Sequence, residues 1–199
     1  MIASIILAHP YRGSFNHAIY ARARETLSSR QVAVHAHDLY EEGFDPVLTE
    51  GELGKLPTED PLTRRYSEEF VESELLVFVH PNWWGQPPAI LKGYIDRVFR
   101  PPQAYDFETG DLGGLAEGRL GGKTGIVFNT SNTEAGREEN YFHDPLEYIW
   151  KRCVFGFCGI TESHRRMFRI VSESSQEERK GWLDEVEALL LLALDARVP

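Results

Sequence analysis

Cysteine is scarce in this sequence, and its placement excludes several kinds of site. The two cysteines, Cys153 and Cys158, are separated by four residues, so they form neither a redox C-x-x-C pair nor half of a zinc site. Both lie in an apolar stretch, which predicts buried free thiols and suits a reducing cytoplasm. No metal-ligand set is identifiable, and no serine–histidine–aspartate or cysteine–histidine signature indicates a protein nucleophile.

The sequence also lacks a complete nucleotide-binding motif. Gly121-Gly122-Lys123-Thr124 is similar to the end of a P-loop, but Glu117 stands where the earlier glycine is required. The stretch also precedes a predicted strand instead of following one. No G-x-G-x-x-G follows the first predicted strand, so a Rossmann dinucleotide site is not supported.

Positive charge and long apolar runs are likewise in short supply. A formal net charge of −10 disfavours binding to nucleic acid or to anionic lipid. The longest apolar run after the amino terminus, residues 188–194, is far too short to span a bilayer. We therefore expect a cytoplasmic protein with no membrane span and no nucleic-acid partner.

What is present is a regular alternation of apolar strands and amphipathic helices. The 199 residues, 42% of them hydrophobic, suffice for one compact domain spanning residues 1–199. The predicted strands cover residues 2–8, 31–38, 75–79, 125–129 and 161–171. The predicted helices cover residues 16–28, 63–73, 88–99, 145–157 and 174–196. This order predicts an α/β flavodoxin-like three-layer sandwich with a five-stranded parallel sheet, interrupted by an excursion at about 100–122.

In such a fold the ligand lies at the carboxyl ends of the strands, so the loops that follow strands one, three and four matter most. Residues 9–17 join a strand to a helix amino terminus, where free N–H groups attract phosphate. Residues 80–88 place two tryptophans beside prolines, which suits a flat aromatic ligand. Residues 129–133 are dense in small hydrogen-bonding groups. Each loop also has a plainer interpretation. The first loop can simply cap the helix, the tryptophans of the second can cover the core or form a subunit contact, and the third can be a polar turn.

The same segments carry a family resemblance. HPYRGSFNHA, PNWWGQPPAILKGYIDRVF with AYDF close behind, and the NTSNT loop resemble the NAD(P)H:quinone oxidoreductase family, particularly its small bacterial branch. The resemblance implies NAD(P)H as hydride donor, a quinone or other small electrophilic acceptor, and two-electron transfer by a ping-pong mechanism. It implies FMN as cofactor, with FAD as the alternative, and a homodimer with the site at the interface.

The resemblance also assigns roles to residues. Those it assigns to the cofactor are His9, Ser14, Phe15, Asn16, Pro81, Asn82, Trp83, Trp84, Asn129, Thr130, Ser131 and Asn132. Tyr105 and Phe107 match aromatic positions that the partner subunit contributes to the substrate pocket. Tyr141 and His143 are the nearest candidates for a tyrosine and histidine that steady charge during hydride transfer.

The sequence departs from the family pattern at the third loop. Better-known members have Thr-Thr-Gly-Gly where this chain has Asn129-Thr130-Ser131-Asn132, so the approach of the backbone to the cofactor differs. Two other functions remain open: a flavodoxin-like electron carrier, and a flavin-binding regulatory subunit of a transport system.

Overall fold

A five-stranded parallel sheet forms the centre of the molecule, described here by a computed structural model covering residues 1–107 and 116–197. Its strands are β1 (Ile2–Leu7), β2 (Ala33–Asp38), β3 (Leu75–Pro81), β6 (Thr124–Ser131) and β7 (Glu162–Arg169). They lie in the order β2-β1-β3-β6-β7, and every neighbouring pair is parallel. The predicted flavodoxin-like α/β fold is confirmed.

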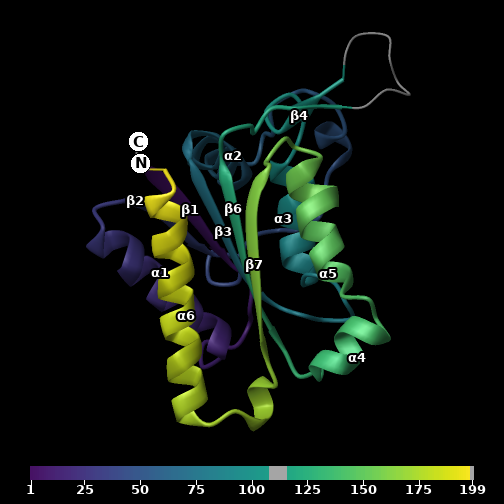
Figure 1. Cartoon of the computed structure of the whole chain (residues 1–199). Helices are drawn as coiled ribbons and strands as arrows, with labels where there is room; N and C mark the ends of the chain where they lie inside the picture. Colours follow the sequence, from purple (N-terminus) through teal and green to yellow (C-terminus); the bar gives the residue numbers. More distant parts are fainter. Residues whose placement is uncertain (108–115, 198–199) are drawn as a thin grey trace.

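Helices cover both faces of the sheet, as Figure 1 shows. They are α1 (Phe15–Ser29), α2 (Pro61–Glu72), α3 (Ala89–Val98), α4 (Ala135–Asn140), α5 (Pro145–Tyr148), the π-helix η2 (Ile149–Gly156) and α6 (Gln176–Asp195), with short 3-10 turns η1 (Glu50–Glu52) and η3 (Val171–Glu173). Helices α1 and α6 pack on one face around Ile19 and Leu190. Helices α2, α3 and η2 pack on the other, around Tyr94 and Trp150. Burial on both faces explains why β3 is apolar for most of its length and why β6 is apolar at its centre, over residues 126–128.

The strand register brings the three predicted loops to one edge. Leu7 pairs with Val79, and Pro81 pairs with Thr130, so β1, β3 and β6 end beside one another. The loops that follow these strands are therefore neighbours in space. This is the edge at which open parallel sheets bind ligands.

The excursion after α3 forms a short antiparallel pair, β4 (Tyr105–Asp106) with β5 (Glu117–Gly118), and residues 108–115 lie outside the described part. The pair adjoins the amino-terminal end of β6, opposite the edge that carries the three loops (Figure 1). Lys123, in the stretch similar to a P-loop, donates hydrogen bonds from Nζ to the Val71 and Ser73 carbonyls. These carbonyls end α2, so here the lysine caps a helix.

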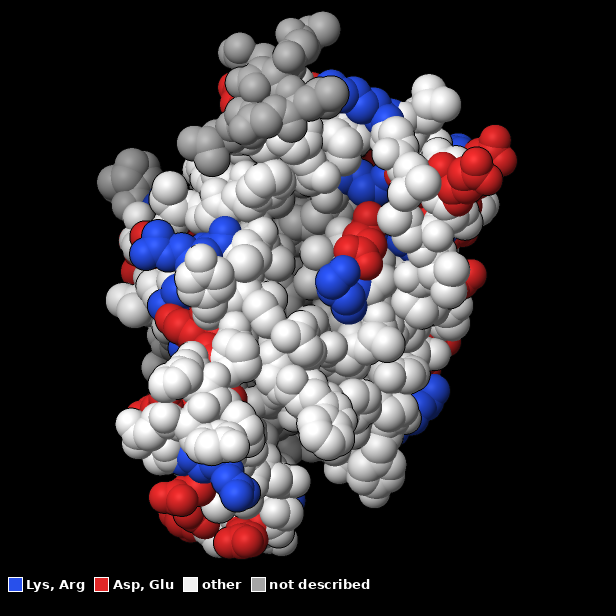
Figure 2. All heavy atoms as spheres, turned by 90° about the vertical axis from the view of Figure 1, so that its right-hand side faces the viewer, with Lys and Arg blue, Asp and Glu red and all other residues white. Residues whose placement is uncertain are grey.

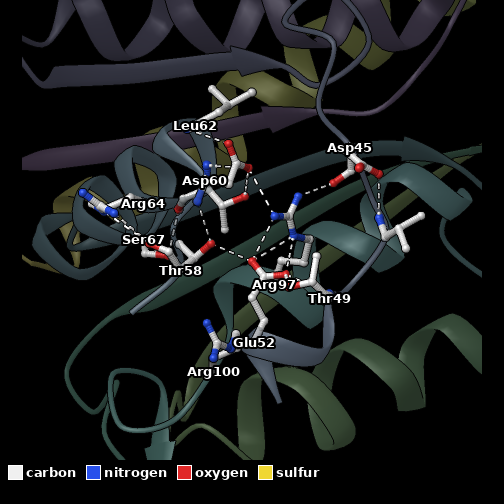
Figure 3. A network of polar contacts seen from close by, with 12 residues as sticks. Asp45, Thr49, Glu52, Thr58, Asp60, Leu62, Arg64, Ser67, Arg97 and Arg100 are labelled. Atoms are coloured by element: carbon white, nitrogen blue, oxygen red, sulfur yellow. Dashed lines mark hydrogen bonds and ion pairs between the residues drawn. The ribbon is translucent and has the colours of Figure 1, made fainter. Parts of the chain in front are cut away.

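A buried ion pair attaches the long connection between β2 and α2 to the underlying helix. The Arg97 guanidinium contacts Glu52 Oε1 at 2.9 Å and the Asp45 carbonyl at 2.6 Å, and Thr58 also donates to Glu52 (Figure 3). Burial alone would raise the pKa of Glu52, but hydrogen bonds from Arg97, Thr49 and Thr58 outweigh burial and lower it to about 2.

The helix boundaries depart from the prediction in two places. The helix expected over residues 145–157 begins with α5 and widens into η2. Near its end the Phe157 N–H donates to the Arg152 carbonyl, five residues earlier, which is the hydrogen bond of a π-helical turn. Helix α4 was missed, since its sequence AGREEN has no apolar face to reveal it. Ser175 caps α6, accepting a hydrogen bond from the Glu178 N–H.

Candidate functional site

A pocket of about 470 Å³ opens where the three loops meet. It is lined by His9, Tyr11, Gly13, Ser14, Phe15, Asn16, Pro81, Asn82, Trp83, Thr130, Ser131, Asn132, Thr133, Val171, Ser172 and Arg179. The structure thus brings together ten of the twelve residues expected at the cofactor, all but Trp84 and Asn129.

The first loop ends in a helix amino terminus that can receive an anion. Ser14 caps α1, accepting a hydrogen bond from the His17 N–H at 3.4 Å, so the plainer interpretation of Ser14 is correct as far as it goes. The N–H groups of Phe15 and Asn16 begin the helix and have no carbonyl partner within it. These donors and the helix dipole suit a phosphate group.

Asn16 carries an unpaired buried atom in this pocket. Its side-chain nitrogen donates to Thr130 Oγ1 at 2.8 Å, which ties the first loop to the third. Its Oδ1 is buried without a hydrogen-bond partner. A buried acceptor left unpaired costs about 1–3 kcal/mol, so a ligand hydroxyl or N–H at this position would recover that cost.

His9 presents a donor to the same pocket. The Tyr11 N–H donates to His9 Nδ1 at 3.1 Å, which places the imidazole proton on Nε2. Burial, together with the neighbouring His17, lowers the pKa of His9 and favours the neutral ring. His9 therefore offers a neutral N–H donor that needs no counter-ion.

The second loop is a tight turn that projects an aromatic side chain. Trp83 and Gln86 bond to each other through their backbones, and Trp84 between them has φ 58° and is fully exposed. Gly85 has φ 69°, and a Cβ there would lie 2.6 Å from Pro145 Cγ, so only glycine fits. Non-glycine residues with positive φ cost of order 1–3 kcal/mol and cluster at functional sites.

Trp84 lines a second cleft, of about 380 Å³, beside the first pocket. The two share Asn82 and Thr133. The other residues lining this cleft are Gly85, Arg137, Glu138, Phe142 and Pro145. Sequence reasoning missed Arg137 and Glu138, because helix α4, which carries both, was missed.

Asn129 lies beneath the pocket, in a buried polar network. Its Nδ2 donates to His80 Nε2 at 2.8 Å, and its Oδ1 accepts from Arg165 Nε at 2.8 Å. Trp150 also donates to His80 Nε2, so the His80 proton is on Nδ1, which bonds to the Pro81 carbonyl. Burial lowers the pKa of His80 to about 3. Both polar atoms of the Asn129 side chain are therefore hydrogen-bonded within the protein. The side chain positions the loops and does not line the pocket.

The two predicted catalytic residues lie near the second cleft but do not line it. Tyr141 is 76% exposed and stacks edge-on against Phe142. His143 has φ 58° and Asp144 has φ 40°, so two consecutive residues are left-handed immediately before Pro145. Their catalytic role stays a prediction.

Tyr105 and Phe107 do not reach the pocket of their own chain. They lie on and beside β4, at the opposite end of the sheet, where Tyr105 packs edge-on against Phe157 with 4.9 Å between ring centroids. Any contribution to a substrate pocket must therefore come through a second copy of the chain.

The fold and pocket together define a flavodoxin-like protein with a helix amino terminus facing a pocket beside an aromatic cleft. Comparison with known proteins agrees. The Flavodoxin_2 family model, described as a flavodoxin-like fold, matches residues 1–190. The chain therefore belongs to the Flavodoxin_2 family, and the resemblance to its NAD(P)H:quinone oxidoreductase members is confirmed.

Individual relatives cover nearly the whole chain. An uncharacterized NAD(P)H oxidoreductase of Haemophilus influenzae is 30% identical over 187 residues, covering 90% of this chain and 89% of the relative. Ribosyldihydronicotinamide dehydrogenase [quinone] of Mus musculus is 29% identical, covering 90% and 86%. The structure of Smu.1420 from Streptococcus mutans UA159 superposes with a TM-score of 0.84 at 30% identity, covering 96% of this chain and 98% of the other.

Proposed function

We propose that this protein is a flavin-dependent NAD(P)H:quinone-type oxidoreductase that transfers two electrons by a ping-pong mechanism. The observation that carries the proposal is the convergence of the three strand-end loops on one pocket, with phosphate-type donors at α1 and an aromatic cleft alongside. A bound flavin supplies the hydride chemistry. The chain's own residues bind it, orient the substrates and exclude water.

The residues fit the cofactor as follows. The α1 amides and Ser14 would hold a phosphate, and the unpaired Asn16 Oδ1 would accept from a sugar-alcohol hydroxyl. Pro81 and Trp83 would border the ring, and the polar atoms around Thr130 would meet its hydrogen-bonding edge.

FMN is the cofactor we propose, with FAD as the alternative. An FMN-dependent NADH-azoreductase from Bacillus anthracis is 19% identical to this chain and shares the fold, with a TM-score of 0.74. Arg179 and Ser172 extend the pocket beyond the first loop. The Arg179 guanidinium would pair with the second phosphate of FAD, which FMN lacks. Mass spectrometry of the released cofactor distinguishes FMN from FAD.

We further propose a homodimer in which Tyr105 and Phe107 complete the partner's substrate pocket. Figure 2 shows a broad uncharged area on the side of the molecule that it presents, between small groups of charged side chains. A groove of about 390 Å³ at the end of this face is lined mainly by apolar residues, including Leu53, Phe99 and Phe157. Exposed apolar patches of this kind mark interaction sites. Light scattering should give twice the mass of one chain.

No described helix could cross a membrane. Both cysteines are free: Cys158 is buried as predicted, but the prediction was wrong for Cys153, which is exposed. Free thiols suit the cytoplasmic location that we propose, since thiols persist in a reducing compartment.

The test is steady-state kinetics of purified holoprotein with NADH or NADPH and 1,4-naphthoquinone. If donor and acceptor occupy one cleft in turn, double-reciprocal plots at several quinone concentrations give parallel lines. Intersecting lines contradict the ping-pong order. Absence of turnover, with flavin bound, favours the electron carrier or the regulatory subunit.

A further inference from the structure

The second cleft, beside the three strand-end loops, is lined by a carboxylate that is almost completely buried. Glu138 on α4 is 1% exposed, yet it lines this cleft. Asn82 Nδ2 donates to its Oε1 at 3.1 Å, and among the described residues no other side chain or N–H group bonds to this carboxylate. One neutral donor satisfies a buried carboxylate poorly, so a further donor is expected from whatever enters the cleft.

The orientation of the Asn82 side-chain amide toward Glu138 is fixed. Its Oδ1 accepts from the Gly85 N–H at 3.0 Å, so its nitrogen must face Glu138. The turn that carries Trp84 therefore also fixes the orientation of the carboxylate. The acceptor offered to a ligand is pre-organised.

A donor lies beside this acceptor. Arg137 precedes Glu138 on α4, lines the same cleft, and has no carboxylate within ion-pair distance in the described part of the chain. The rest of the wall is largely apolar and aromatic, with Trp84, Phe142 and Pro145. A flat ring with a carboxamide matches this arrangement, because its N–H can donate to Glu138 and its carbonyl can accept from Arg137.

We propose that Glu138 and Arg137 recognise the carboxamide of the nicotinamide ring, with Glu138 selecting the amide against a carboxylate. This inference rests on the proposed function and deepens it by naming residues that recognise the hydride donor. A nicotinic-acid dinucleotide has a carboxylate in place of the amide N–H, so it would face Glu138 with like charge and no donor.

Glu138 and Arg137 have opposite effects on the preference for the nicotinamide dinucleotide over the nicotinic acid dinucleotide. The ligand carboxylate is repelled by Glu138 and attracted by Arg137. Glu138 is buried and Arg137 is exposed to solvent, so the Glu138 contribution is screened less and dominates in the wild type.

The experiment measures dissociation constants of NAD⁺ and nicotinic acid adenine dinucleotide by calorimetry on the flavin-loaded protein. We expect the wild type to prefer NAD⁺ by roughly tenfold to a hundredfold, the scale of one hydrogen bond to a charged group. Glu138→Gln should remove most of this preference, whereas Arg137→Gln should increase it. Glu139→Gln is the matched control, since Glu139 pairs with Arg169 outside the cleft.

Opposite shifts in the two variants support the assignment. An unchanged ratio in Glu138→Gln, or the same shift in both variants, overturns it. Loss of flavin from folded Glu138→Gln with an unchanged ratio also overturns it and places Glu138 at the cofactor instead. If Glu138→Gln does not fold, the Arg137→Gln variant is the test, because Arg137 is exposed and its replacement should not disturb folding. An unchanged ratio of the two dissociation constants in Arg137→Gln then overturns the proposal.

Failure of the proposed function is separable from failure of this inference. If the wild type oxidises neither NADH nor NADPH with 1,4-naphthoquinone, both fail. If NADH is oxidised but the binding ratio does not respond to Glu138→Gln, only the role of Glu138 fails.

Discussion

Arg165 holds Asp144 through two parallel hydrogen bonds, of 2.7 Å from Nη2 to Oδ1 and 2.9 Å from Nη1 to Oδ2. Arg165 is 4% exposed at its side chain and also bonds to Asn129 and Glu147. Asp144 is left-handed, as is His143 before it. The pair therefore stabilises a strained turn beside the second cleft and links it to the network below the third loop.

We predict that Arg165→Met lowers the free energy of unfolding by about 3 kcal/mol, because it leaves partly buried carboxylates and the Asn129 oxygen unpaired. Urea denaturation measures this. Arg166→Met is the control, since Arg166 pairs with Glu185 on the surface and its loss should cost under about 1 kcal/mol. Equal losses in the two variants would contradict the role given to Arg165.

The first loop predicts the largest effect on cofactor binding. Replacing Ser14 and Asn16 together with alanine should weaken flavin affinity by roughly 1–3 kcal/mol, the scale of a few lost hydrogen bonds. Fluorescence titration of the apoprotein measures it. Ser29→Ala, which removes a hydrogen bond to the Thr26 carbonyl at the far end of α1, should leave affinity unchanged. An unchanged affinity in the double variant would rule out this loop.

His80 should make stability depend on pH in the mildly acidic range. Burial lowers its pKa from 6.5 to about 3 in the folded chain, so the unfolded chain binds a proton that the folded chain does not. The stabilisation is complete above pH 6.5 and is lost as pH falls toward 3, at about 1.4 kcal/mol per pH unit for one proton. His80→Gln should flatten the profile over this range; an unchanged slope in urea titrations would refute the assignment.

Glu52 should contribute at lower pH. Its pKa falls from 4.5 to about 2 on folding, so its stabilisation is present above pH 4.5 and is lost as pH falls toward 2. Glu52→Gln leaves Arg97 with Asp60 as its remaining charged partner and should remove one proton from the acid unfolding profile. A proton uptake between pH 4.5 and 2 equal to that of the wild type would show that other carboxylates dominate.

The sequence predicted the sheet and the loops because their signals are local. Buried parallel strands are continuous apolar runs, and β3 reads that way over residues 75–79. Ligands of such folds bind at the carboxyl ends of the strands, and this rule then located the first two loops with little further information. Most of the predicted cofactor residues consequently line one pocket.

What the sequence could not predict depends on contacts between distant segments. Helix α4 has no apolar periodicity, so the burial of Glu138 follows only from its packing against Asn82. Asn129 is polar in a strand-end loop, which suggested a ligand contact, but its partners His80 and Arg165 come from other strands. The exposure of Tyr141 depends on the same unpredicted helix.

The contact between Gly85 and Pro145 restricts how the cleft can change. A side chain at position 85 would meet Pro145 Cγ at 2.6 Å, and its backbone would still have to adopt φ 69°. A variant library that varies the tryptophan turn alone should therefore yield few folded members with any residue but glycine at 85. Libraries that also vary position 145 remove the clash but keep the backbone requirement, so the two positions should be randomised together and glycine should still dominate at 85.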